Sequence, residues 1–192
     1  MVNERIINFL FEIASLRRLT RSHRQFISEA NDNISDHSFR VAIIGMIMAR
    51  LEHADENKVL KMCLFHDLAE ARTGDANLVN KQYLKFSEKE VRKDQMEGLP
   101  FAQEIIELLE EYEEMKTKES IVAKDADKID QMILQQEYFR NDEKNRVIWH
   151  KFNGSFIKTK SAKNLARKIK EANPLEWLYK VAEDKTGLKV KR

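Results

Sequence analysis

Apolar residues recur at helical spacing along most of the chain, and this pattern predicts an all-α fold. Between residues 6 and 16, apolar side chains repeat every three or four positions, as in an amphipathic helix. Two further predicted helices, over 36–52 and 56–71, are apolar on nearly all sides near their middles. Helices of that kind are buried, so we expect both to be central. The sequence has no strand pattern longer than three residues.

Polar residues at the starts of apolar stretches suggest where other helices begin. Ser35 and Ser120 are candidate N-caps, and Ser87 with Glu90 forms the pattern of a capping box. We therefore predict further helices over 88–97, 101–116, 121–139, 161–172 and 174–182. We expect the stretches 17–35, 72–86 and 141–160 to be mainly irregular, with a short helix near 77–84. The result is a bundle of roughly seven to nine helices.

Composition narrows the picture to one globular domain. The chain has 192 residues, of which 42% are apolar and 34% charged, with only five glycines and two prolines. A formal net charge of +2 gives no push toward a nucleic acid polymer as partner. The longest apolar run, 41–49, is too short to cross a bilayer, and the single cysteine, Cys63, allows no intramolecular disulfide. We expect a cytoplasmic protein without a membrane partner.

Ionisable residues interrupt three of the apolar helices, where their burial would be costly unless each found a partner. His37 begins the second predicted helix, His66 and Asp67 lie near the end of the third, and Asp127 lies in a later one. Two imidazoles and two carboxylates form a mixed N/O set that suits a divalent cation. Glu70 follows His66 by one helical turn and could orient a water or take its proton.

Structural interpretations compete with this one, because a lone helical histidine is most often a packed or hydrogen-bonded residue. We expect His23, His53 and His150 to be packed or hydrogen-bonded residues of this kind, without a role in the site. We likewise interpret Asp36, Asp125 and Asp130 as surface or capping groups. Asp75 follows Gly74 in a predicted turn, from which it could orient the same water or a metal ligand.

Three extended motifs carry a family resemblance. They are "SDHSFRVA" around His37, "HDLAEARTGD" around His66 and Asp67, and "KDADKIDQMILQQEY" around Asp127. In this order and spacing they resemble the HD-domain superfamily of metal-dependent phosphohydrolases, and within it the branch of 5′-deoxynucleotidase and oxetanocin-like proteins. The resemblance covers about residues 8–140, which leaves 141–192 as a helical extension of a single domain over 1–192.

The resemblance implies a site and a cofactor. The implied metal ligands are His37, His66, Asp67 and Asp127, with one divalent ion bound. Co²⁺, Mn²⁺ or Mg²⁺ is the expected ion, and Zn²⁺, Ni²⁺ and Fe²⁺ are alternatives. The chain has no histidine between residues 66 and 127, which favours a mononuclear site. The resemblance also implies a homodimer, for which the aromatic residues after 148 could serve as an interface or could cap the core.

Further roles are implied outside the ligand set. Glu70 corresponds to a catalytic acid/base and Asp75 to a second functional carboxylate. The branch binds phosphate with an arginine upstream of the first histidine, and the candidates are Arg18, Arg21 and Arg24, with Arg21 the best match. The family's Gly-Trp after this arginine is replaced by residues 23–24, which leaves the nucleoside-contacting part open. Glu137 matches a recurrent position of the branch, and we expect a supporting or structural role for it.

The predicted function is a phosphomonoesterase that releases phosphate from deoxynucleoside 5′-monophosphates. One alternative is another chemistry of the superfamily, such as hydrolysis of a cyclic nucleotide, a cyclic dinucleotide or a guanosine polyphosphate alarmone. The other is a non-catalytic nucleotide- or metal-binding module, against which the presence of Glu70 and Asp75 beside the full ligand set argues.

Overall fold

The computed structural model describes residues 2–27, 29–187 and 189. Most of these residues lie in helices, which are joined by turns and irregular segments. A lone antiparallel bridge between Thr20 and Asn33 accounts for all the β-structure in this part of the chain. The all-α prediction is confirmed.

The α-helices are α1 (Val2–Ile13), α2 (Ile34–Glu52), α3 (Glu56–Phe65), α4 (Glu70–Thr73), α5 (Glu88–Met96), α6 (Ala102–Glu114), α7 (Lys118–Tyr138), α8 (Glu143–Gly154), α9 (Lys160–Glu171) and α10 (Glu176–Thr186). Short 3₁₀ helices are η1 (Ala14–Arg18), η2 (Ser22–Gln25) and η3 (Asn80–Gln82). None of the described helices is both long and apolar enough to span a membrane.

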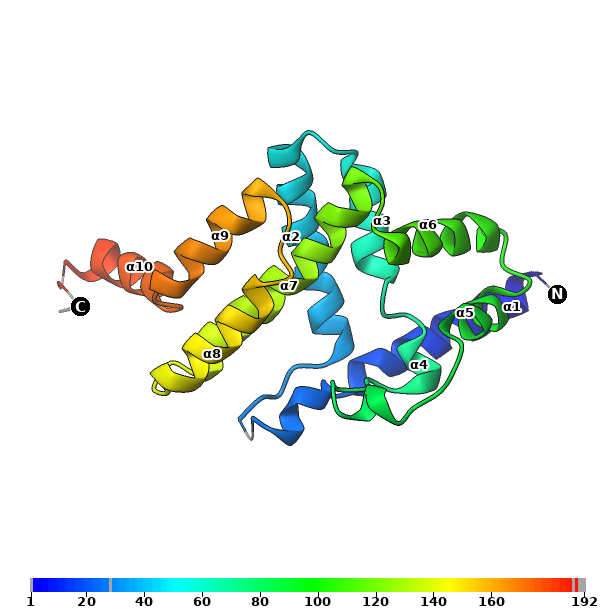
Figure 1. Ribbon diagram of the computed structural model, residues 1–192, viewed down its shortest axis with the longest axis horizontal. Coiled ribbons are helices and arrows are strands. Elements are labelled where there is room, and N and C mark those ends of the chain that lie inside the picture. Colours follow the sequence, from blue (N-terminus) through cyan, green and yellow to red (C-terminus); the bar gives the residue numbers. More distant parts are fainter. Residues whose placement is uncertain (1, 28, 188, 190–192) are drawn as a thin grey trace.

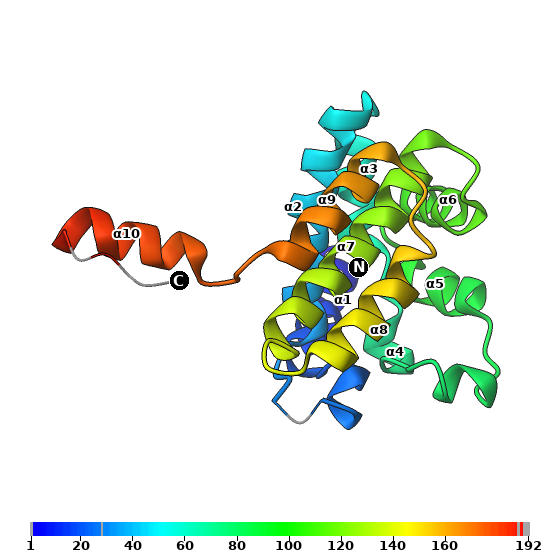
Figure 2. The same ribbon diagram turned by 60° about the vertical axis from the view of Figure 1, so that its left-hand side comes forward.

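The centre of the molecule is made by α2, α3 and α7, which lie side by side (Figures 1 and 2). Their shared core is fully buried and includes Val41, Met48, Met62, Ala126 and Met132. The helices α2 and α3 approach closely where Gly45 faces Cys63, since a side chain at position 45 would overlap the cysteine Sγ atom. As the apolar pattern predicted, both helices are central.

A second apolar cluster lies between α1, α5 and α6, on the right of Figure 1. It contains Phe9, Leu16, Met96 and Leu109, and it also takes in Leu68 from the segment between α3 and α4. This segment carries the His66–Asp67 pair, so the second cluster anchors it from one side.

The predicted continuous helix from 56 to 71 is wrong. The helix α3 ends at Phe65, and the next residues form tight turns, with Leu68 N–H donating to Phe65 O and Glu70 N–H to Asp67 O. Leu68 is buried in the second cluster, and its carbonyl accepts a hydrogen bond from Gln95 at 2.9 Å. Packing against a distant part of the chain therefore bends the backbone here, and local periodicity contains no trace of it.

Two predicted caps are also wrong. The N-cap of α2 is Asn33, whose backbone is extended and whose side chain accepts from Asp36 N–H at 3.0 Å. At the start of α7, Thr117 is the N-cap and Ser120 is its reciprocal partner three residues later. The predicted cap Ser87 is confirmed, because its hydroxyl accepts from Glu90 N–H.

The expectation that 141–160 is irregular is wrong as well. The helix α8 begins after Asp142, whose side chain accepts from Asn145 N–H, and it packs along α7. His150 of α8 donates to Met132 O of α7 at 3.1 Å, which confirms the structural role expected of this histidine. Beyond α9, α10 extends away from the rest of the molecule (Figure 2).

Candidate metal centre

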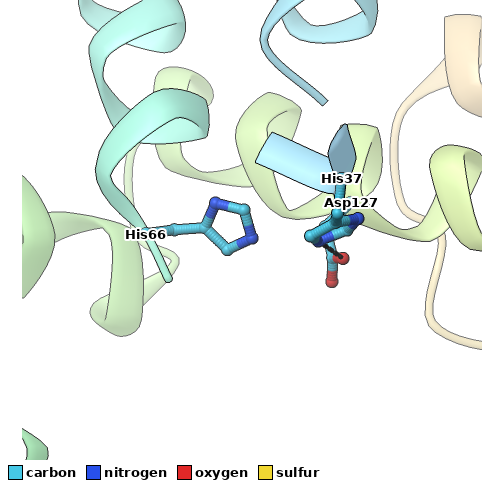
Figure 3. Close-up of side chains that lie close together, drawn as sticks. All are labelled: His37, His66 and Asp127. Atoms are coloured by element: carbon cyan, nitrogen blue, oxygen red, sulfur yellow. Dashed lines mark ion pairs between the residues drawn. The ribbon is translucent and has the colours of Figure 1, made fainter. Parts of the chain in front are cut away.

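Three helices bring the predicted ligand residues to one point. His37 lies in the first turns of α2, His66 directly follows α3, and Asp127 lies in the middle of α7. One ligand atom from each of these side chains lies within 4.8 Å of the other two. Figure 3 shows His66 pointing toward the pair formed by His37 and Asp127, whose Nε2 and Oδ1 atoms are 3.3 Å apart.

The other nitrogen of each imidazole is already engaged. His37 Nδ1 lies 2.7 Å from Asp130 Oδ2, and His66 Nδ1 lies 2.8 Å from the carbonyl oxygen of Cys63. Both bonds direct the Nε2 atoms toward the centre, and neither buried Nε2 atom has a hydrogen-bond partner among the described residues. Buried polar atoms without a partner are costly. Two such nitrogens beside carboxylates are the donor set that a divalent cation requires, so the residues fit a metal ion.

Asp67 completes the donor set. Its Oδ2 atom lies 3.2 Å from His66 Nε2 and 3.4 Å from His37 Nε2. Burial favours the neutral acid, but His66, His37 and Arg21 outweigh this effect and hold the pKa of Asp67 well below its usual range. Asp67 is therefore an anion at neutral pH, as a metal ligand must be.

The site attracts positive charge even without a metal. Burial and the charge of Arg21 both disfavour the imidazolium form of His37. The close carboxylate of Asp127, the hydrogen bond to Asp130 and the charge of Asp67 outweigh them and raise the pKa of His37 to about 9. The carboxylates thus exceed the fixed cations at this point, an imbalance that a divalent ion would correct.

Glu70 lies at the start of α4, beside the donor set. Its buried Oε2 atom finds no hydrogen-bond partner in the described part of the chain. Burial, together with the charges of Asp67 and Asp75, raises the pKa of Glu70 to about 9. A carboxyl group that keeps its proton at neutral pH, next to a candidate metal site, is suited to acid–base chemistry.

Asp75 connects the site to the loop before α2. Gly74 adopts a positive φ of 74°, which turns the chain at the end of α4. Asp75 Oδ2 then accepts from Ser22 N–H at 2.7 Å and lies 3.6 Å from Arg21 Nε. In this arrangement Asp75 holds the arginine segment against the site.

Of the three candidate arginines, the structure brings one to the site. Arg21 Nη1 lies 3.3 Å from Asp67 Oδ2, and the Arg21 backbone N–H donates to Asp32 O across the bridge at Thr20. Arg18 is exposed on η1, and Arg24 is exposed and donates to Asn31 at 3.0 Å. Neither belongs to the described cavity wall around the donor set.

Asp130 is the residue that sequence reasoning missed. It was expected at the surface or as a cap, but its side chain is 1% exposed and it binds both His37 and Arg40, the latter at 2.7 Å. A signal was present, because Asp130 follows Asp127 by three residues and therefore shares its helix face. Asp125 was expected at the surface or as a cap, but it is buried and accepts from the N–H and the hydroxyl of Thr159, which is itself the N-cap of α9.

A cavity of about 770 Å³ opens beside the donor set. Its wall includes Arg21, His23, Glu70 and Asp75, together with side chains of α7 and α8. This volume is within the range of sites for small organic ligands. His23, one of the two residues that stand in place of the family's Gly-Trp, lines the cavity and pairs with Asp32 at 2.8 Å.

Comparison with known proteins identifies the family of this chain. A family model described as "HD domain" matches residues 13–173, and the chain belongs to that family. The resemblance found in the sequence motifs is confirmed. The match extends beyond residue 140 to include α8 and α9.

Several relatives carry the name 5′-deoxynucleotidase. The HDDC2 protein of Dictyostelium discoideum is 31% identical over 123 residues, which are 57% of this chain and 64% of that protein. The HDDC2 protein of Mus musculus is 28% identical over 139 residues, 69% of each chain. The chain thus spans about two thirds of the length of these relatives.

Among solved structures, the PH0347 protein of Pyrococcus horikoshii has a TM-score of 0.69 at 26% identity, covering 86% of this chain and 98% of that one. A predicted metal-dependent phosphohydrolase of Magnetospirillum magnetotacticum has the same TM-score at 21% identity, covers 88% and 90%, and shows the shared fold.

Proposed function

We propose that this protein is a metal-dependent 5′-nucleotidase that releases phosphate from deoxynucleoside 5′-monophosphates. The observation that carries the proposal is the pair of buried, unengaged Nε2 atoms of His37 and His66 beside two carboxylates, within reach of Arg21 and Glu70. The names of the relatives support the same substrate class.

In this proposal His37, His66, Asp67 and Asp127 hold one divalent ion, with Co²⁺, Mn²⁺ or Mg²⁺ as activators. A bound ion would lower the pKa of a water toward neutrality and offset the charge of the phosphate. Lys128 and Gln131 support the site by donating to the two oxygens of Asp127, each at 3.0 Å.

The remaining steps fall to residues at the cavity wall. Arg21 presents a planar guanidinium, which matches the oxygens of a phosphate better than a lysine would. Binding a phosphate in place of the Asp67 and Asp75 carboxylates keeps this buried cation paired. Glu70 carries a proton at neutral pH and donates it to the 5′-oxygen as the bond between phosphorus and that oxygen breaks.

Phosphate release tests the proposal. Deoxynucleoside and ribonucleoside 5′-monophosphates would be incubated with the protein and Co²⁺, Mn²⁺ or Mg²⁺, with a chelator control for each. Metal-dependent release from the deoxynucleotides is expected. Nucleotide binding without release would favour a non-catalytic module. Bound metal without activity on any monophosphate would overturn the substrate assignment and direct the search to cyclic and polyphosphorylated nucleotides.

We also propose a homodimer formed from a single domain over residues 1–192 in the cytoplasm. The dimer is supported by a stripe on α2, where Phe39, Ile43, Ile47 and Leu51 repeat every four residues and are all exposed. Such a face resembles an interface more than a free surface. Ile47→Glu should convert the protein to a monomer in multi-angle light scattering, whereas Val147→Glu, at an exposed apolar residue of α8, should not. The free Cys63 thiol is in keeping with a reducing compartment.

A further inference from the structure

The helix α8 and the turn that follows it present a row of aromatic side chains to the cavity. Trp149, Phe152 and Phe156 follow one another at spacings of three and four residues, and all three line the cavity wall. Their rings meet edge to face, at 5.8 Å between the first two centroids and 5.2 Å between the last two. Phe152 and Phe156 remain 38% and 49% exposed, so ring surface is left for another molecule.

The row lies beside the candidate metal centre. The helices α7 and α8 are antiparallel neighbours (Figure 1), and the bond from His150 to Met132 sets their alignment. Counting from that bond at equal rise, Phe152 is level with Asp130, which lies one turn of α7 from Asp127. A ligand whose phosphate lay at Arg21 and the metal donors could therefore extend its other end along this row.

Unengaged amide groups lie on the same wall. Asn153, next to Phe152, is 2% exposed, and its Nδ2 atom makes no hydrogen bond to any described residue. Gln135 of α7 is 8% exposed, and its Oε1 atom is likewise unengaged within the described chain. Both residues line the cavity. A buried donor and a buried acceptor without partners are costly, and a ligand that offers the complementary groups would satisfy them.

We propose that this wall is the nucleobase subsite: the base of the substrate stacks on the Phe152 ring, and the Asn153 and Gln135 amides hydrogen-bond its edge. Flat heteroaromatic rings with donors and acceptors around the rim are the ligands that such a combination recognises. The inference rests on the proposed nucleotidase function and adds the part of the site that selects the base.

Comparison with a substrate that lacks a base isolates the contribution of the base contacts to catalysis. The values of kcat and KM would be compared for a deoxynucleoside 5′-monophosphate and for 2-deoxyribose 5-phosphate, which has the same sugar and phosphate. Phe152→Ala should lower kcat/KM for the nucleotide about tenfold, mainly through KM, as expected for loss of one stacked base. The value for the sugar phosphate should not change, because that substrate never reaches the row.

Phe86→Ala is the matched control, since Phe86 lines the cavity from outside α8 with a similar exposure of 43%. It should leave the ratio between the two substrates unchanged. Equal losses on both substrates in Phe152→Ala would indicate a merely structural role and overturn the proposal. A fall in this ratio in Phe86→Ala and not in Phe152→Ala would overturn it too, because the base would then contact Phe86 and not the aromatic row.

Tryptophan fluorescence tests base binding without depending on the nucleotidase reaction. It can therefore show whether the base subsite is wrong or the proposed reaction is wrong. The chain has two tryptophans, so Trp177→Phe leaves Trp149 as the sole tryptophan, in contact with Phe152. Deoxynucleosides, which lack phosphate, should quench this signal, and 2-deoxyribose should not. Quenching without phosphate release from any nucleotide would retain the base subsite and reject the reaction. No quenching, together with no kinetic effect of Phe152→Ala, would reject the subsite.

Discussion

The Nδ1 atom of His37 lies 2.7 Å from the Oδ2 atom of Asp130, and both side chains are almost completely buried. This bond fixes the ring so that Nε2 faces Asp67 and Asp127. Partners of this kind orient a metal ligand and strengthen its basicity. Asp130 is therefore a positioning residue of the candidate centre.

Asp130→Asn should reduce metal affinity by about 10- to 100-fold, the usual effect of losing such a partner. Affinity would be measured by competition with a chromogenic chelator. Asp125→Asn is the matched control, because this equally buried aspartate binds Thr159 at the start of α9 instead of His37. It should lower the free energy of unfolding and leave metal affinity unchanged. Equal metal affinity in Asp130→Asn and the wild type would contradict the role assigned to Asp130.

Glu70→Gln should retain the metal and lose about 10²- to 10⁴-fold in kcat, the range for removal of an acid–base catalyst. The amide keeps the shape of the side chain and cannot exchange the proton. Metal content by mass spectrometry and phosphate release would be measured on the same sample. Glu88→Gln, at an exposed glutamate of the cavity wall, is expected to have little effect. Full turnover in Glu70→Gln would refute the assignment.

Arg21→Lys should raise KM for the nucleotide about tenfold or more with metal affinity retained, because lysine keeps the charge and loses the planar fork. Steady-state kinetics on one deoxynucleotide would show the effect. Arg18→Ala and Arg24→Ala serve as controls, since both arginines are exposed and lie away from the donor set. If either control raised KM as much as Arg21→Lys, the phosphate contact would lie elsewhere.

Gly45→Ala should destabilise the protein by about 1–3 kcal/mol, as overpacking of a close helix contact does. The added methyl group would overlap Cys63 Sγ and approach Val59 to 3.1 Å. Urea denaturation would measure the change. Gly154→Ala is the control, because a Cβ atom there would meet no described atom within 4 Å. A Gly45→Ala protein as stable as the wild type would show that α2 and α3 can separate without cost.

Stability should decrease in mild acid partly through His150. Burial lowers the pKa of His150, with Lys170 and Arg146 adding to the effect against the bond to Met132 O. The unfolded chain then binds a proton more readily than the folded one, so stability is lost as the pH falls through about 6.5. His150→Gln removes this titration. Its free energy of unfolding should therefore fall less between pH 7.5 and 5.5 than that of the wild type, and an identical fall would contradict the prediction.

Helical periodicity was sufficient to predict most of the fold. It located the central α2 and α7, since a face that repeats every 3.6 residues is encoded locally. It failed where a distant contact decided the structure: α3 stops at Phe65 because Leu68 packs into the cluster with α1 and α5. It also missed α8, whose polar composition suggested an irregular segment although Asp142 caps it.

The candidate site followed from motif spacing for its central residues. The four predicted ligand residues and Arg21 lie together in the structure. The spacing of the motifs did not indicate which other groups are buried beside them. Asp130 is an example: its spacing places it on the helix face of Asp127, but only the packing of α7 against α2 shows that it is buried and bound to His37. The amides of Asn153 and Gln135 are further examples, since their lack of partners is a property of the cavity alone.

The position of the donor set along the chain has a consequence for folding. His37, His66–Asp67 and Asp127 belong to three separate stretches of sequence, and the described chain has a lone cysteine to offer for covalent bonding. An ion held by all of them would close two long loops at once, as a cross-link does. The same coordination that prepares the site for chemistry would then also hold these three segments together in the folded protein. Chelation of the ion should therefore lower the melting temperature of the protein along with its activity.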